Sequence, residues 1–115
     1  MKKSEINFEV NLDVNHIPEK ITWKASDSEQ ANPAECKAVM MSIWEGDSQN
    51  TLKIDLWTKD MMIDEMQKFY HQTFLSMADA FERATGEKEI CEDLRAFSKY
   101  FAEKMKLIDP PKDGE

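Results

Sequence analysis

A change of hydrophobic period within one uninterrupted stretch constrains the fold of this chain more than any other feature. Apolar and polar residues alternate over residues 52–56, whereas over residues 63–70 the apolar residues recur at spacings of three and four. The first pattern is typical of a half-buried strand and the second of an amphipathic helix. No glycine or proline separates them, so we expect a last strand that runs directly into a long helix. Thr58 to Asp60 would then cap that helix.

The first half of the sequence predicts four strands. Period-two alternation covers residues 6–12 and 21–24, and two further strands are predicted in "CKAVMMSIW" (36–44) and "TLKIDLWT" (51–58). A polar connector with an Asn-Pro step occupies residues 26–35, and the turn residues of "EGDSQN" join the last two strands as a hairpin. Consecutive strands with short connections favour an antiparallel meander with one apolar face.

The second half predicts two helices. An apolar stripe from Ile63 to Ala84 ends at Gly86, which can adopt the left-handed C′ conformation, and Asp79 and Arg83 are spaced as an i,i+4 ion pair. A second stripe runs from Ile90 to Met105. The short link predicts an antiparallel helical hairpin packed on one face of the sheet, an α+β fold of order ββββαα. We expect a single domain over residues 1–108 and a flexible tail over residues 109–115.

The charge balance of the chain argues against polyanionic partners. The 115 residues carry 15 lysines and arginines against 23 aspartates and glutamates, a formal net charge of −8. This field would oppose binding to nucleic acid or to an anionic membrane surface. No apolar run reaches the roughly 20 residues that cross a bilayer, and the N-terminal residues lack the apolar core of a secretory signal. We therefore expect a cytoplasmic protein that neither binds nucleic acid nor inserts into a membrane.

No sequence motif for catalysis or cofactor binding is present. The chain has no glycine-rich phosphate loop, no nucleophile elbow, no zinc-protease helix motif and no calcium loop, and it contains only three glycines. His16 lies in a connection and His71 on the polar flank of the first helix, so both are expected at the surface. Cys36 and Cys91 lack metal-ligand spacing and are expected to be reduced, packed thiols. We expect no enzymatic activity, no cofactor and no metal.

Strand alternation places three large apolar side chains on the outer face of the last two strands. If the apolar residues of the fourth strand face the helices, Trp57 faces away from them, and Met40 and Trp44 share that outer face. Each tryptophan contributes roughly 200 Å², so we expect a patch that contacts another protein. A homodimer or higher homo-oligomer is the simplest version. Two structural alternatives remain: a one-residue slip would turn Met40 and Trp44 inward, and Trp57 could fold under the start of the long helix.

Four segments resemble the gliding-motility-associated protein GldC of Bacteroidetes-type gliding bacteria. They are "MKKSEI", "NTLKIDLWTKDM", "DEMQKFYHQTFLSMADAFERATG" and "YFAEK", and together they span the chain from its first residue to about residue 107. The resemblance implies a cytoplasmic accessory protein of gliding motility without established catalytic residues or cofactor. It therefore supplies a cellular process and leaves the molecular mechanism open.

A weaker resemblance rests only on element order and acidic charge. Four antiparallel strands followed by two helices are similar to the cytoplasmic export chaperone SecB, whose family holds unfolded clients on apolar grooves. We expect a non-enzymatic accessory protein that acts through protein–protein contact. The alternatives are a chaperone-like holdase for an exported client, and a small-ligand binder or enzyme with a pocket between sheet and helices.

Overall fold

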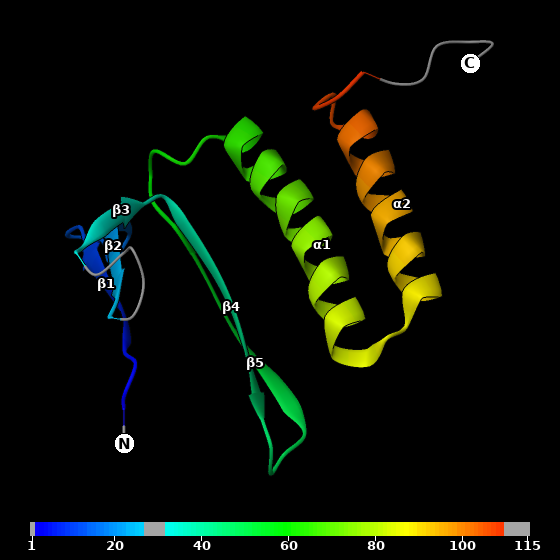
Figure 1. Cartoon of the computed structure of the whole chain (residues 1–115). Coiled ribbons are helices and arrows are strands. Elements are labelled where there is room, and N and C mark those ends of the chain that lie inside the picture. Colours follow the sequence, from blue (N-terminus) through cyan, green and yellow to red (C-terminus); the bar gives the residue numbers. More distant parts are fainter. Residues whose placement is uncertain (1, 27–31, 110–115) are drawn as a thin grey trace. The chain divides into compact units, whose positions relative to one another are not determined.

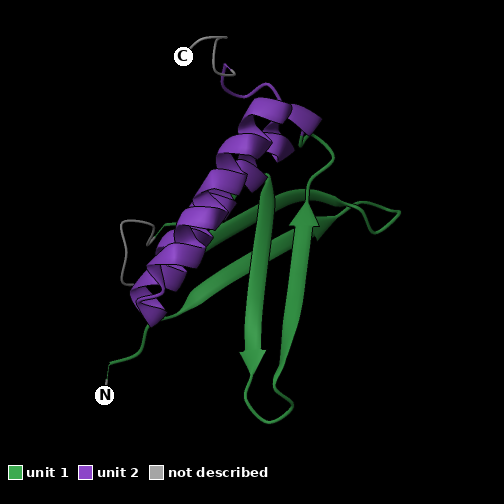
Figure 2. Cartoon of the chain, turned by 90° about the vertical axis from the view of Figure 1, so that its right-hand side faces the viewer, with its two compact units in different colours: residues 1–61 green, residues 62–115 purple. Residues whose placement is uncertain are grey.

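The computed structural model describes residues 2–26 and 32–109, and its fold is α+β (Figure 1). It consists of two compact units, residues 1–61 with the strands and residues 62–115 with the helices (Figure 2). Part of the predicted connector, residues 27–31, and most of the predicted tail, residues 110–115, lie outside the described residues. The packing of the helices on a sheet face stays a prediction.

Within its described residues, the first unit forms five strands in two antiparallel sheets and not one four-stranded meander. One sheet has the order β1-β2-β3, and the other pairs β4 with β5. The strands are β1 (Ile6–Leu12), β2 (Pro18–Ala25), β3 (Ala34–Cys36), β4 (Ala38–Glu45) and β5 (Asn50–Trp57). The antiparallel pairing of neighbouring strands is as predicted, while the single sheet is replaced by a three-plus-two arrangement.

The predicted third strand divides at Lys37, where the chain passes from one sheet to the other. β3 pairs with β2 and β4 pairs with β5, with only Lys37 between β3 and β4. The Lys37 carbonyl accepts a hydrogen bond from the Thr58 N–H (2.8 Å), and the Pro18 carbonyl accepts one from the Lys59 N–H (3.2 Å). Thr58 is buried at this junction. The pattern of apolar residues could not show the break, because alternation continues through a bend of one residue.

The alternation that predicts the first two strands is confirmed by their pairing. Phe8 lies opposite Trp23, and Val10 lies opposite Ile21. Directly opposed residues point to the same side of a sheet, so these apolar side chains share one face. The rings of Phe8 and Trp23 stack with centroids 6.5 Å apart. Ile21 is fully buried and is one of the few large side chains with no exposed surface.

Asp13 closes the turn between β1 and β2 and binds Lys59, the second residue after β5. Its Oδ1 accepts hydrogen bonds from the N–H groups of Asn15 (2.8 Å) and Ile17 (2.9 Å). Its Oδ2 lies 2.7 Å from Lys59 Nζ. The hydrogen bond from Lys59, with those from the turn, lowers the pKa of Asp13, and the same contact raises the pKa of Lys59.

The second unit is a helical hairpin whose start differs from the prediction. Its helices are α1 (Ile63–Thr85) and α2 (Lys88–Lys104). Met62 is the N-cap residue, and its N–H donates to Glu65 Oε1 (3.0 Å). The cap predicted at Thr58–Asp60 is therefore wrong. The Asp60 carboxylate accepts a hydrogen bond from the Thr58 hydroxyl instead, which lowers the pKa of Asp60.

The link between the helices confirms the role predicted for Gly86. Gly86 has φ of 75°, a left-handed conformation that costs glycine little, and its N–H donates to the Glu82 carbonyl (2.8 Å). The Thr85 hydroxyl donates to the Phe81 carbonyl (2.8 Å) and accepts from the Glu87 N–H (3.2 Å). The chain thus leaves α1 and enters α2 within three residues with these polar groups paired.

Small side chains form the contact between the two helices. Four of them are buried: Ala78, Cys91, Ser98 and Ala102. The Ser98 hydroxyl donates to the carbonyl of His71 (3.2 Å), and His71 is half-buried rather than fully at the surface as predicted. Small residues at seven- and four-residue spacing let helix backbones approach closely, and we call this contact the seam of the hairpin.

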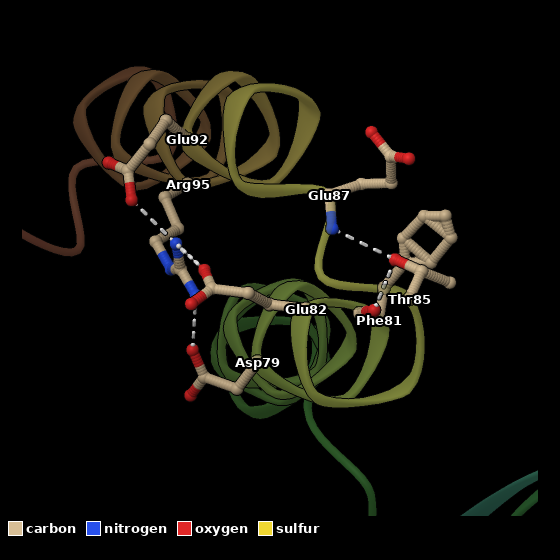
Figure 3. Close-up of polar contacts among 7 residues, drawn as sticks. All are labelled: Asp79, Phe81, Glu82, Thr85, Glu87, Glu92 and Arg95. Atoms are coloured by element: carbon tan, nitrogen blue, oxygen red, sulfur yellow. Dashed lines mark hydrogen bonds and ion pairs between the residues drawn. The ribbon is translucent and has the colours of Figure 1, made fainter.

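Arg95 joins the helices beside the seam (Figure 3). Its Nη2 lies 2.9 Å from Asp79 Oδ1, and its Nη1 lies 3.0 Å from Glu82 Oε1 and 2.6 Å from Glu92 Oε1. Asp79, predicted to pair with Arg83 along α1, therefore contacts α2. These hydrogen bonds, that to Asp79 foremost, raise the pKa of Arg95. One guanidinium thus offsets the repulsion among three carboxylates.

Enlarging a seam residue should separate the helices. Ala102→Leu adds volume where Ala102 is fully buried, and we expect it to lower the free energy of unfolding by about 1–3 kcal/mol. Ala96→Leu is the matched control on the same helix, because Ala96 is exposed, and it should change stability by less than about 0.5 kcal/mol. Urea unfolding followed by circular dichroism measures both. Equal losses would contradict the assignment of the seam.

The Asp13–Lys59 contact should make stability depend on pH. A lowered native pKa of Asp13 stabilises the fold above the ordinary aspartate pKa, and this stabilisation is lost as the pH falls through the native value. The raised native pKa of Lys59 stabilises the fold below the ordinary lysine pKa. This stabilisation is lost as the pH rises through the native value. Asp13→Asn keeps an oxygen acceptor for the turn. The difference in unfolding temperature between wild type and variant should therefore be largest between about pH 5 and pH 9. Thermal unfolding at a series of pH values measures it. A difference that stays constant down to pH 2 would contradict this.

Candidate protein-contact surfaces

The pairing of β4 with β5 places the three predicted contact residues on one face of the hairpin. Trp44 lies opposite Thr51, and Trp57 lies opposite Ala38. Opposed residues point to the same side and alternate residues share a face, so Met40 and Trp44 lie on the face of Trp57. The predicted alternation is confirmed by this register, and the one-residue slip is not observed. We call this surface the outer face of the hairpin.

The outer face has an exposed indole at each end and a charged centre. Trp44 is 64% exposed and Trp57 is 54% exposed, whereas Met40 is half-buried. At about 3.4 Å per residue, the register puts the two tryptophans roughly 20 Å apart along the hairpin. Between them on the same face, Lys53 Nζ lies 3.1 Å from Asp55 Oδ1. The two indoles therefore form separate sites and not one continuous patch.

The opposite face of the same hairpin is apolar except at its turn end, where Glu45 lies opposite Asn50. Its six other residues from the two strands are Val39, Met41, Ile43, Leu52, Ile54 and Leu56. Ile43, Leu52 and Ile54 all expose a large share of their surface. This face corresponds to the predicted apolar face of the meander. A two-stranded sheet with apolar side chains on both faces is marginally stable alone and gains stability when either face is covered.

The helical hairpin has a second apolar surface, away from its seam. Ile63 is 79% exposed, and Met77, Phe81, Ile90 and Phe97 each expose about half of their surface. On α1 the exposed residues follow the stripe from Ile63 to Phe81. Because an α-helix turns about 100° per residue, this stripe lies about a quarter of a turn around the helix axis from Ala78. Ile90 and Phe97 lie on the corresponding side of α2. Each helix thus contacts the other through one side, and the neighbouring apolar side of each helix stays exposed.

Two apolar grooves lie on the helical hairpin. The groove near the link has a volume of about 480 Å³ and is lined by Met77, Phe81, Ile90, Cys91, Asp93 and Leu94. The groove at the other end has a volume of about 250 Å³ and is lined by Ile63, Met66, Gln67, Tyr70 and Phe101. Each is lined mostly by aliphatic and aromatic side chains, which suits apolar side chains better than charged groups.

Aromatic rings connect the two grooves. Phe74 of α1 contacts Phe97 and Phe101 of α2 edge to face, with centroids 5.6 and 5.2 Å apart. Tyr70 packs against Phe74 at 6.2 Å. Edge-to-face pairs add about 0.5–1.5 kcal/mol each beyond the area that they bury. This cluster holds the middle of the helical apolar surface in a defined shape.

The titratable side chains suggest no second kind of site. Among residues 2–26 and 32–109, no group of three or more histidine, cysteine and acidic side chains could hold a metal ion. Both cysteines are free, Cys91 in the seam and Cys36 half-buried in β3, and burial raises the pKa of each thiol. No helix in the described part of the chain is both long and apolar enough to cross a bilayer.

A family profile decides the relationship of this chain. The profile described as "Gliding motility-associated protein GldC-like" matches residues 18–107, which include β2 to β5 and both helices. The chain belongs to the GldC-like family. The resemblance found in the sequence is thereby confirmed. The comparisons with curated proteins and with solved structures give no match.

The helical grooves and the seam were missed by sequence reasoning. The stripe from Ile63 to Phe81 was predicted to be core, because apolar periodicity marks a face that contacts something without saying what covers it. The seam had a readable signal: small residues recur at positions 91, 98 and 102 of α2. Membership of the GldC-like family supplies a process for this chain, gliding motility, and no residue roles.

Proposed function

We propose that this GldC-like chain supports gliding motility by binding another protein, without catalysing a reaction. The observation that carries this proposal is the outer face of the β4–β5 hairpin, where Trp44 and Trp57 expose 64% and 54% of their surface. Large exposed aromatic groups at fixed positions are typical of interface anchors. A cytoplasmic location is part of the same proposal.

The geometry of the outer face favours a folded partner over a flexible peptide. Two indoles about 20 Å apart on one hairpin require a partner surface of matching length. The Lys53–Asp55 pair between them is exposed and contributes orientation more than affinity. Met40, half-buried next to this pair, adds an adaptable apolar contact. The partner would therefore present two apolar pockets separated by a polar strip.

The helical grooves favour a second candidate function, a holdase for unfolded clients. Their lining of Met77, Phe81 and Ile90 at one end, and of Met66 and Tyr70 at the other, suits apolar segments of varied sequence. Methionine side chains adapt to different partners because they are long and unbranched. An apolar surface of this kind would retain a client without a defined sequence motif.

Loss of one indole should remove the partner. Trp57→Ser in the native cell should abolish recovery of one co-purifying protein and reduce gliding, because an anchor residue typically contributes 2 kcal/mol or more, about a 30-fold loss of affinity. Affinity purification followed by mass spectrometry gives the readout. Tyr100→Ser is the matched control, since Tyr100 is about as exposed but lies on α2. Unchanged recovery with Trp57→Ser would contradict the proposal.

The holdase candidate makes a separate prediction. The wild-type chain in excess should slow the aggregation of reduced insulin chains, measured by light scattering. Phe81→Ser, which alters the larger groove, should remove at least half of that effect, because it takes away an aromatic contact surface. Trp57→Ser should leave it unchanged. No suppression by the wild-type chain would exclude this function.

A further inference from the structure

Strand β4 has one paired edge and one open edge. It pairs with β5, and among residues 2–26 and 32–109 no strand pairs with its other edge. The carbonyls of Lys37 and Glu45 accept hydrogen bonds from Thr58 and Gln49, so backbone groups at odd positions point toward β5. Alternation then directs the backbone N–H and C=O groups of positions 38, 40, 42 and 44 to the open edge.

The open edge of β4 lacks the charges that protect the other sheet edges. The remaining edge strands carry charged side chains within their lengths: Glu9 in β1, Glu35 in β3, and Lys53 and Asp55 in β5. In β4, residues 38–44 are uncharged and only the last residue, Glu45, is charged. Charges on an edge strand oppose pairing with another chain, and their absence over a long apolar edge favours it.

We propose that β4 pairs antiparallel with β4 of a second copy of this chain, about a two-fold axis at Met41. The product is one continuous four-stranded sheet in which the two β4 strands are central and the two β5 strands are outermost. A two-fold axis makes the contact self-complementary and closed. The outer strands carry Lys53 and Asp55, so further pairing at the new edges is opposed and assembly stops at two copies.

The position of the axis follows from parity and charge. A two-fold axis that passes through a residue pairs even positions with even positions and odd with odd. The apolar faces of the two copies then lie on the same side of the joined sheet, and the even positions, which carry the open hydrogen-bonding groups, lie opposite one another. An axis at Met41 places Glu45 opposite Lys37 of the second copy, twice by symmetry. An axis at Ser42 would place Glu45 opposite Val39 and lose both charge pairs. In a chain with a net charge of −8, the register that pairs opposite charges is favoured.

This pairing also joins the separated indoles. With the axis at Met41, Trp44 lies opposite Ala38 of the second copy, and Ala38 lies opposite Trp57 within its own hairpin. Trp44 of one copy and Trp57 of the other are then two strands apart, about 10 Å, and not roughly 20 Å apart as in one hairpin. Ala38 between them is small enough to let the rings approach. The dimer thus carries two joined indole pairs on its outer face.

The inference stands on the edge of β4 and goes beyond the proposed docking function. Sedimentation of the full chain over a concentration series should show a reversible dimer. In a Cys36→Ser background, mild oxidation of Met41→Cys should yield a disulfide-linked dimer, because non-hydrogen-bonded pairs place Cα atoms about 4.5 Å apart. Ile43→Cys, on the same face, lies opposite Val39 of the second copy and should not cross-link. Cross-linking of neither variant, or of both equally, would overturn the proposal.

A charge exchange provides an independent test of the register. Glu45→Lys should weaken dimerisation about tenfold, because two attractive pairs become repulsive. Lys37→Glu should do the same, and the double variant should restore wild-type dimerisation. Circular dichroism confirms that each variant is folded. Failure of the double variant to recover would overturn this register. A monomeric wild type that still loses its partner with Trp57→Ser would overturn the pairing alone, and a dimer without a partner would overturn the docking function alone.

Discussion

The first unit depends on how the polar backbone is satisfied where one strand passes between two sheets. Buried N–H and C=O groups must be paired, and at Lys37 the carbonyl accepts a hydrogen bond from the N–H of Thr58, which is itself buried. Lys59 continues the contact to the start of β2 and binds Asp13 in the preceding turn. Because this junction ends the first sheet at β3, the β4–β5 hairpin has two faces and an edge of its own. The candidate contact surfaces of this unit all follow from that departure.

The helical unit solves a different packing problem. Two helices can approach closely where side chains are small, and Ala78, Ser98 and Ala102 provide that surface. The large aromatic and aliphatic residues cannot fit there and collect on the neighbouring arc, where Phe74 holds them in an edge-to-face cluster. Arg95 then contacts three carboxylates beside the seam and offsets their mutual repulsion. Small side chains on one side of each helix therefore allow close contact, and large apolar side chains on the neighbouring side form the exposed surface.

Membership of the GldC-like family associates this chain with gliding motility. A protein that acts by binding another protein needs exposed groups at fixed positions. The β4–β5 hairpin and the two helices joined through Arg95 both provide them. The outer face and the helical grooves differ in kind. The first spaces two indoles across a charged centre, which suits one partner surface, and the second offers adaptable aliphatic and aromatic linings. The edge of β4 and the helical grooves belong to different units, so the two proposed functions are separable by mutation.

The sequence by itself determined what depends on neighbouring residues. Period-two alternation located the strands and the common face of Met40, Trp44 and Trp57, helical spacing located both helices, and Gly86 marked the end of the first. Tertiary structure decided what depends on distant residues. The break at Lys37 and the choice of Met62 over Asp60 as cap require strand pairing or contacts that no local pattern encodes. The physical reason is that side-chain periodicity reports the direction in which a residue points, whereas hydrogen bonding and packing between segments decide what it meets.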